Sequence, residues 1–292
     1  MAAVNNEFKT LVIEDLAHYD GLSKPVRASV LERLLTKKMN IDKLHPNPTD
    51  EFSMTDIGPN YGIISDYADS MRRAVSLNMP IMDEPLIVEK MSTGGYMLLN
   101  GHHRWMAAHR VGIKTVPVQI VNVAAEEDIF AGIKNSNNVM CVSIDLDEVL
   151  LADRESYPED VKPSFLIKKL FPKVLRYNAG ALINELRSEG FDVWIYTSNF
   201  HSTDYIEIML KNQKTKVDGI VNGLGRRNNR DNIKNAFINK YKYSLHIDND
   251  GIICVDNIKK EFESIDVETT QNTWSADIMK AIKELNLGNK EE

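Results

Sequence analysis

From residue 139 to residue 285, short apolar segments alternate with stretches whose apolar residues recur at helical spacing. We expect strands at Met140–Asp145, 192–197, 219–222 and 244–248. We expect helices at 179–188, 202–210, 231–240 and 275–285. This alternation is typical of a parallel sheet with helices on both faces. The second half is therefore predicted to be an α/β domain built on a doubly wound parallel sheet.

Polar side chains follow three of these expected strands. Asp145 and Asp147 follow the first, and the other two are followed by Thr197-Ser198-Asn199 and Asp248-Asn249-Asp250. Ligands of open parallel sheets bind beyond the carboxyl ends of the strands. Phosphoryl transfer uses such groups: a nucleophilic carboxylate, hard oxygens for Mg²⁺, and a hydroxyl and a cation that balance charge on phosphate oxygens. Lys234, on the helix before the last of these strands, could supply the cation.

Residues 139–285 resemble the haloacid dehalogenase superfamily, whose first motif, Asp-x-Asp-x-Thr/Val, is matched by Asp145-Leu146-Asp147-Glu148-Val149. The resemblance implies a Mg²⁺-dependent phosphatase in which Asp145 is the nucleophile and Asp147 the acid/base. It further implies roles for the remaining polar residues: Thr197 and Lys234 in catalysis, Asp145, Asp147 and Asp248 as metal ligands, Asn249 or Asp250 near the metal, and Ser198 and Asn199 in substrate binding.

Only about thirty residues separate Val149 from Asn178, and they include Pro158, Pro163 and Pro172. This length leaves room for no more than a minimal cap over the site. The substrate is accordingly expected to be a phosphorylated small molecule or the phosphorylated end of a nucleic acid or protein.

The first half reads as a smaller α+β domain. Ser23-Lys24-Pro25 predicts a helix start, followed by apolar residues at helical spacing up to Leu35. We expect another helix at 64–77 and one from Gly101 to the residue before Gly112. Strands are expected at 41–48, 85–90, 96–99 and 115–121.

The segment Gly101-His102-His103-Arg104 joins an expected strand to an expected helix. Unpaired N–H groups at the first helical turn, together with the helix dipole and Arg104, favour an anion. Gly101 lets the backbone approach a phosphate closely. A metal site at the two adjacent histidines is disfavoured, because no third ligand stands at a diagnostic spacing.

Residues 38–123 resemble the ParB/sulfiredoxin-like fold, on the order of their strands and on Gly-His-His-Arg-x-x-Ala. The resemblance implies that this turn binds a nucleoside phosphate (ATP, ADP or CTP). The Gly-His-His-Arg sequence is most similar to that of the free serine kinases. Glu51 or Asp50 could then serve as a kinase base. There is no cysteine at His102 or His103, which excludes sulfiredoxin chemistry, and Asn100 stands where that kinase branch often has Asp.

A polar, turn-prone stretch, Asn135-Ser136-Asn137-Asn138, separates the two halves. We therefore expect domains at 1–137 and 138–292. Because no apolar run approaches the roughly 18 residues of a membrane span, no membrane partner is expected. Cys141 and Cys254 both lie in apolar strands, which suggests reduced thiols and a cytoplasmic protein. The net charge of -7 argues against a broad nucleic-acid-binding face.

These observations predict a phosphohydrolase, with a nucleotide-binding domain that is either a kinase or a gate. The alternative is a nucleotide-sensing regulatory protein whose second domain is a scaffold of low or no activity. A nuclease is a third, less favoured interpretation, given the acidic charge and the absence of a helix-turn-helix DNA reader.

Overall fold

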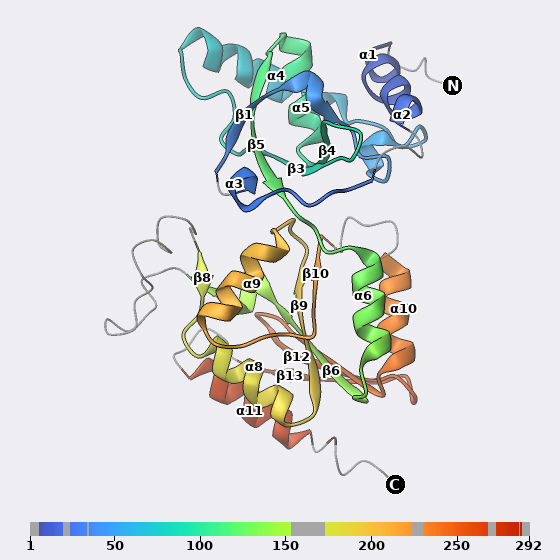
Figure 1. Cartoon of the computed structure of the whole chain (residues 1–292), viewed down its shortest axis with the longest axis vertical. Coiled ribbons are helices and arrows are strands. Elements are labelled where there is room, and N and C mark those ends of the chain that lie inside the picture. Colours follow the sequence, from blue (N-terminus) through green and yellow to red (C-terminus); the bar gives the residue numbers. More distant parts are fainter. Residues whose placement is uncertain are drawn as a thin grey trace. The chain divides into compact units, whose positions relative to one another are not determined.

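The computed structural model describes residues 6–19, 24–33, 35–152, 173–223, 230–267, 273–285 and 287. The chain forms two compact units, Met1–Val123 and Ala124–Glu292 (Figure 1). Helix α6 (Glu126–Asn135) thus belongs to the second unit, whereas the polar stretch after it was expected to mark the boundary at residue 137. The reason is packing, because Ile129 and Ile133 of α6 share a core cluster with Trp194.

A mixed five-stranded sheet forms the first unit, in the order β1-β5-β3-β4-β2. Its strands are β1 (Lys37–Asn40), β2 (Leu44–His45), β3 (Leu86–Lys90), β4 (Tyr96–Asn100) and β5 (Thr115–Val121). The central pair β3 and β5 is parallel, while β3 and β4 are antiparallel. The expected strands at 85–90, 96–99 and 115–121 are therefore present.

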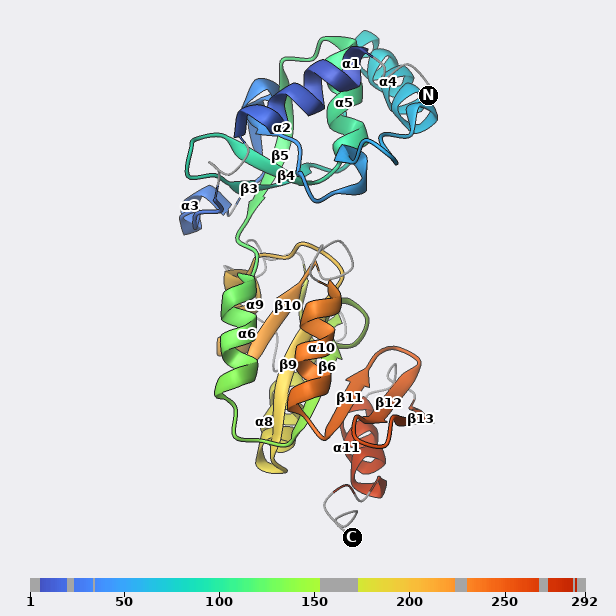
Figure 2. The same cartoon turned by 90° about the vertical axis from the view of Figure 1, so that its right-hand side faces the viewer.

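Helices α4 (Tyr61–Ser76) and α5 (His102–Val111) provide the core of this unit (Figure 2). Met71 of α4 and Met106 of α5 are buried with the β-strand residues Leu86 and Ile120. A helical segment at the N-terminus also contributes through the buried side chain of Val12; it consists of α1 (Asn6–Phe8), a π-helical turn (Lys9–Ile13) and α2 (Glu14–Tyr19).

The helix expected after Ser23 is wrong for most of its length. Among the residues of this stretch that the structure describes, only α3 (Val30–Arg33) is helical, while Pro25 forms an antiparallel bridge with Met91. The N–H of Val26 donates to the carbonyl of Lys90 at 2.9 Å, so the segment is extended against the sheet. The helical spacing was misleading because Leu31, at 80% exposed, does not face the core.

The strand expected at 41–48 is also different. The longer strand precedes it as β1, and a 3-10 turn (Ile41–Lys43) interrupts the chain before β2. Asn40 causes the interruption, because its side chain accepts a hydrogen bond from the N–H of Asp42 at 3.0 Å and so caps the turn.

The second unit contains a six-stranded sheet in the order β10-β9-β6-β11-β12-β13. Its strands are β6 (Met140–Asp145), β9 (Phe191–Thr197), β10 (Gly219–Asn222), β11 (Tyr243–Ile247), β12 (Gly251–Asp256) and β13 (Glu261–Asp266). The first four in this order are parallel, as expected, and the last two extend the sheet as an antiparallel meander that the sequence analysis did not predict. Because β9 and β10 lie on one side of β6 and β11 on the other, the chain reverses its direction across the sheet next to β6.

Helices cover both faces of this sheet (Figure 1). One face carries α6 and α10 (Arg230–Lys240), and the other carries α8 (Ala179–Ser188), α9 (Thr203–Asn212) and α11 (Trp274–Glu284). The two clusters include Trp194 on the first face and Ile144 on the second, as the alternation of side chains along strands requires. The mixed α/β class is thereby confirmed. Most of the predicted cap, residues 153–172, lies outside the described residues.

No helix among the described residues is long and apolar enough to cross a membrane.

Candidate active site

The carboxyl ends of the parallel strands in the second unit meet at one edge of the sheet. Asp145 ends β6 and Thr197 ends β9, with Asp145 opposite Tyr196 in the register. Asn222 ends β10, and Asp248 follows β11 directly. The sheet therefore brings residues that are far apart in sequence to the edge where ligands of such sheets bind.

Asp145 is a buried carboxylate, 8% exposed. Its Oδ1 accepts a hydrogen bond from the N–H of Glu148 at 2.8 Å, so the side chain caps the single helical turn Leu146–Leu150. A short hairpin of β7 (Leu151–Ala152) and β8 (Val174–Leu175) follows that turn. Burial, and secondarily the charge of Asp147, raise the pKa of Asp145.

Asp147 is held by three donors from the segment 197–201, which bends just after β9. Its Oδ2 accepts hydrogen bonds from Thr197 Oγ1 at 2.6 Å and Asn199 Nδ2 at 3.0 Å. Its Oδ1 lies 2.7 Å from His201 Nε2. Burial alone would raise the pKa of Asp147, but the hydrogen bonds from His201 and Thr197 outweigh it and hold that pKa well below its usual range. Asp147 is therefore an ionised carboxylate in this arrangement.

The end of β10 fixes the segment that carries these three donors. The N–H of Gly223 donates to the carbonyls of Thr197 at 2.9 Å and Asn199 at 3.1 Å. The fully buried Asn222 donates through Nδ2 to the carbonyl of His201. Gly223 has φ +67°, and a Cβ there would lie 2.3 Å from Phe200 Cε1, so this position requires glycine.

Asp248, which was predicted as a metal ligand, lies at the start of the turn that follows β11. Its Oδ1 accepts the N–H groups of Asp250 at 3.0 Å and Gly251 at 3.1 Å, and its own N–H donates to the carbonyl of Gly251 at 3.1 Å. Asp248 therefore organises the turn between β11 and β12. Asn249 and Asp250 lie exposed in that turn.

The described residues contain no group of three or more His, Cys, Asp or Glu side chains that could hold a metal ion. The predicted Mg²⁺ ligands Asp145, Asp147 and Asp248 are thus not gathered into one, because Asp147 turns toward β9 and Asp248 toward its own turn. The donor set in this arrangement does not fit a three-carboxylate Mg²⁺ site.

Lys234 and Ser198, the other predicted site residues of this unit, are exposed. Arg226 and Arg227, in the basic stretch before Lys234, lie outside the described residues. Arg230, at the start of α10, is close enough for its charge to lower the pKa of Tyr196, although burial and Asp145 raise that pKa overall. Of the described cations of this stretch, Arg230 is therefore the one whose charge acts on Tyr196, near the carboxyl end of β9.

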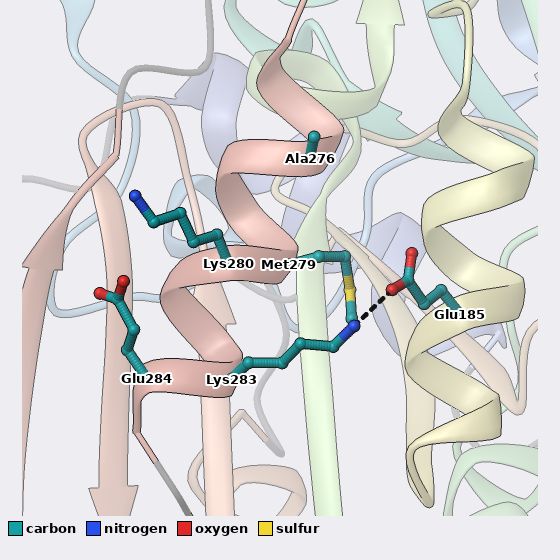
Figure 3. Close-up of a pocket in the computed structure, with 6 residues that line it drawn as sticks. All are labelled: Glu185, Ala276, Met279, Lys280, Lys283 and Glu284. Carbon is teal, nitrogen blue, oxygen red and sulfur yellow. Dashed lines mark hydrogen bonds and ion pairs between the residues drawn. The ribbon is translucent and has the colours of Figure 1, made fainter.

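A surface cavity of about 560 Å³ lies elsewhere in the unit, between α8 and α11 (Figure 3). Glu185 of α8 and Lys283 of α11 form an ion pair of 2.8 Å across it. Met279 also lines this cavity, and none of the predicted site residues does.

In the first unit, the predicted anion site lies at the N-terminus of α5. Gly101 precedes the helix with φ +98°, and a Cβ there would lie 2.5 Å from Leu86. A glycine has no side chain with which to cap the first turn, so this helix start suits an external acceptor. The local geometry is the strand, glycine turn and helix that the sequence predicted.

The two histidines point back into the protein rather than toward an incoming phosphate. His102 is buried, and its Nε2 accepts the N–H of Asn47 at 3.3 Å. His103 Nε2 accepts the N–H of Asn60 at 3.1 Å, and burial lowers the pKa of His103. Both rings pack against Phe52, with centroids 5.3 and 5.1 Å apart. They therefore hold the loop before α4 against the start of α5.

Arg104 and the predicted base have separate surroundings. Arg104 Nη1 donates to the carbonyl of Glu84 at 2.7 Å. Glu51 is exposed, whereas the neighbouring Asp50 places Oδ2 3.5 Å from His102 Nδ1. Of the two acidic residues considered as a base, Asp50 is the one that contacts the turn.

Comparison with known proteins supports the fold predicted for the first half of the chain. Residues 28–137 match the family model "ParB N-terminal domain", which confirms the prediction of a ParB-like region there and extends through α6. No curated protein matches the chain.

Three solved structures are similar to part of it. Sulfiredoxin from Arabidopsis thaliana is 19% identical, with a TM-score of 0.24, over 30% of this chain and 83% of its own. The C-terminally truncated chromosome-partitioning protein ParB from Caulobacter crescentus, complexed with CTP-gamma-S, is 24% identical, with a TM-score of 0.25, over 36% of this chain and 56% of its own. The same ParB complexed to the centromeric parS site is 23% identical, with a TM-score of 0.23, over 35% of this chain and 50% of its own. The match thus spans about half the length of the ParB chains.

Sequence reasoning missed His201, Asn222 and Gly223. The chain bends at residues 198 and 199, just after β9, so the contact of His201 with Asp147 depends on this bend and had no signal in the sequence. The roles of Asn222 and Gly223 depend on the pairing of β9 with β10 and had no sequence signal of their own.

Proposed function

We propose that this chain is a phosphoryl-transfer enzyme whose second unit hydrolyses phosphate monoesters through Asp145, as in haloacid dehalogenase-type phosphatases. One observation carries the proposal: a buried carboxylate at the switch point of a parallel sheet lies beside an ionised carboxylate held by three donors. Perturbed carboxylates at a ligand-binding edge are typical of functional sites. The match of the Asp-x-Asp-x-Val segment to the family motif supports the same assignment.

In the proposed reaction, an oxygen of Asp145 attacks phosphorus while the bond from phosphorus to the leaving oxygen breaks. The bonding electron pair departs with the leaving group, which takes a proton from solvent. Water then attacks the phosphorus of the aspartyl-phosphate, inorganic phosphate leaves, and Asp147 accepts the proton of that water before returning it to solvent. Asp147 is unprotonated before this second step, although the hydrogen bonds that lower its pKa also make it a weak base.

Substrates whose leaving group departs without prior protonation are favoured by this arrangement. Aryl phosphates belong to this class, whereas alkyl phosphates need an acid. We therefore expect faster turnover of 4-nitrophenyl phosphate than of an alkyl phosphate. The family resemblance implies a requirement for Mg²⁺, so the assay is run both with Mg²⁺ and with a chelator.

The first unit is proposed to bind a nucleoside phosphate at Gly101–Arg104. The ParB N-terminal domain match covers this turn, and the first-turn N–H groups of α5 are suited to an anion. ATP, ADP and CTP are the ligands to compare. A kinase function of this unit would use Asp50 in preference to Glu51, because Asp50 is the one near His102.

A second candidate function is a nucleotide-responsive regulatory protein with an inactive second unit. The carboxylate of Asp248, which is engaged in its own turn, and the separation of the predicted Mg²⁺ ligands favour it. Calorimetry with the three nucleotides, together with phosphate release from an aryl phosphate panel with Mg²⁺ or with a chelator, separates the candidates. Nucleotide binding without any phosphate release supports the regulatory protein. Phosphate release that is lost in Asp145→Asn supports the enzyme.

A further inference from the structure

Helix α4 of the first unit carries two lines of apolar residues, and only one of them faces the core. Ile64, Ala68 and Met71 are buried, and the helix lies at the periphery of its unit (Figure 2). A second line, spaced alternately by four and three positions, does not belong to the core cluster. This α4 stripe consists of Ile63, Tyr67, Ser70, Ala74 and Leu77. Such spacing is that of the contact positions in a pair of helices.

Most of the α4 stripe is open to solvent. Ile63 is 42% exposed, Tyr67 40% and Leu77 67%. Ser70 is exposed as well, and Ala74 is half-buried. Exposed apolar residues that are gathered on one face mark interaction sites more often than scattered ones do. The stripe therefore has the composition and the spacing of a surface that packs on another helix.

The sizes of the side chains indicate which helix fits. The large residues Ile63 and Tyr67 lie in the N-terminal half of α4, and the small residues Ser70 and Ala74 lie in the C-terminal half. In an antiparallel pair of identical helices, the N-terminal half of each lies along the C-terminal half of the other. A two-fold axis between positions 68 and 69 puts Ile63 level with Ala74 of the other copy, and Tyr67 level with Ser70. Each large side chain then meets a small one, as interdigitated packing requires.

A parallel pair of the same helices would pack poorly. It would place Tyr67 against Tyr67 and Ala74 against Ala74, which crowds one layer and leaves a gap in another. The order of large and small residues along α4 therefore favours the antiparallel arrangement.

The charges beside the α4 stripe point to the same register. Asp66 and Arg73 flank the stripe on the side away from the buried residues. In the antiparallel arrangement, Asp66 of each copy lies about 3 Å along the helix axis from Arg73 of the other, at 1.5 Å per residue. Because each side chain leans toward the N-terminus of its own helix, the two approach each other. The two-fold axis repeats this pair of opposite charges.

Both charged groups are available for a partner. Asp69 and Arg72 of α4 pair with each other at 2.6 Å. Among the residues that the structure describes, neither Asp66 nor Arg73 is in an ion pair. Size and charge thus come from different residues and require the same two-fold register, which a second copy of this chain satisfies.

We propose that α4 binds a second copy of this chain as an antiparallel, two-fold helix pair, in which Tyr67 faces Ser70 and Asp66 faces Arg73. A contact formed by one helix from each copy is small, so the dimer is weak and reversible. It is independent of the proposed phosphoryl transfer and of nucleotide binding at α5.

Analytical ultracentrifugation of the full chain over a dilution series tests the proposal. The parent should show a reversible equilibrium between monomer and dimer. Asp66→Arg and Arg73→Asp each place like charges together twice, so each should weaken dimerisation by about tenfold. The difference from the parent should shrink at high salt, because exposed charges are screened. Glu207→Arg, which makes the same change of charge as Asp66→Arg on the exposed side of α9, should dimerise like the parent.

Mixing the two charge variants identifies the register. An equimolar mixture of Asp66→Arg and Arg73→Asp should form a heterodimer about as stable as the parent dimer, because every contact then joins an arginine to an aspartate. The double variant Asp66→Arg/Arg73→Asp should dimerise like the parent for the same reason. Thermal unfolding should be the same in all of these variants, since both side chains are exposed.

A change of size tests the packing separately. Ser70→Tyr should weaken dimerisation, because Tyr67 of the other copy already fills that layer, and adding Tyr67→Ser should restore it. The proposal is overturned by a chain that stays monomeric at every concentration, by a dimer that neither charge variant weakens, or by charge variants whose mixture dimerises no better than each alone.

Discussion

Nε2 of His201 lies 2.7 Å from Oδ1 of Asp147, although fifty-four positions separate them in the chain. The contact closes a set of three donors around one carboxylate, with Thr197 and Asn199 on the other oxygen. Asp147 thereby stays ionised, two residues after Asp145, which is the proposed nucleophile.

Replacing His201 should weaken both the local structure and the reaction. His201→Ala removes one donor to a charged acceptor, which is worth about 2 kcal/mol. We expect a lower free energy of unfolding by about that amount and a fall of about tenfold or more in kcat on an aryl phosphate, because Asp147, the proposed proton acceptor, loses a group that positions it. Urea denaturation and steady-state kinetics measure the two effects. Tyr205→Phe, whose ring lies 6.3 Å from that of His201, serves as the packing control and should keep its kcat.

Gly223→Ala should be strongly destabilising for two separable reasons. The new Cβ would lie 2.3 Å from Phe200 Cε1, and φ +67° disfavours any L side chain. We expect a loss of about 1–3 kcal/mol in unfolding free energy, the usual cost of an overpacked or strained site. Combining it with Phe200→Ala should relieve the clash and leave the backbone strain. A single variant as stable as the parent would show that the end of β10 does not constrain the segment 197–201.

The pH dependence of stability should separate Asp147 from Asp145. Because hydrogen bonds lower the pKa of Asp147 in the folded chain, its contribution to stability is present above the ordinary Asp pKa of 3.8 and is lost as the pH falls below it. The stability deficit of Asp147→Asn should therefore be largest near neutral pH and shrink in acid. Asp145 has the opposite sign, since burial raises its pKa, and Asp145→Asn should be more stable than the parent at neutral pH. Urea midpoints measured from pH 7 to pH 3 test both directions, and parallel curves for the two variants would contradict the account.

In the first unit, Arg104 and His102 at the start of α5 should have different effects when they are replaced. Arg104→Ala should weaken nucleotide binding by about tenfold, the loss expected for one charged contact to phosphate. His102→Ala should instead lower stability, because Nε2 of His102 accepts the N–H of Asn47 and its ring packs against Phe52. Calorimetry with ATP, ADP and CTP, beside thermal unfolding, measures both. Equal affinity in Arg104→Ala would place the anion elsewhere.

Much of the second unit could be predicted because its signals are local. The strand Met140–Asp145 and the helix Ala179–Ser188 have the predicted bounds, since a buried parallel strand reads as a continuous apolar run and a surface helix shows its period. β13 was missed because an edge strand with exposed residues has no such run, whereas β12, around Cys254, does have one. The helix expected at 24–35 was wrong because Leu31 repeats at helical spacing without a core to face.

The sequence predicted which residues lie at the site better than it predicted the contacts between them. The positions of Asp145, Asp147 and Thr197 follow from strand ends, which a sequence reveals. The three-donor arrangement around Asp147 depends on which side chain each carboxylate faces, and this is set by β10 through Asn222 and Gly223. For the same reason, the sequence did not reveal that Oδ1 of Asp248 accepts a hydrogen bond from the N–H of Gly251 in the turn before β12.

In the proposed reaction, Asp145 accepts a phosphoryl group from the substrate. Rapid acid quench of the full chain during turnover of 4-nitrophenyl phosphate, followed by peptide mass spectrometry, tests it most directly, with Glu207→Gln as the control for a surface carboxylate. The account predicts one phosphoryl group on the peptide that carries Asp145, none in Asp145→Asn, and unchanged labelling in Glu207→Gln. Turnover of the aryl phosphate that persists in Asp145→Asn, or a phosphoryl group found on another residue, would contradict it.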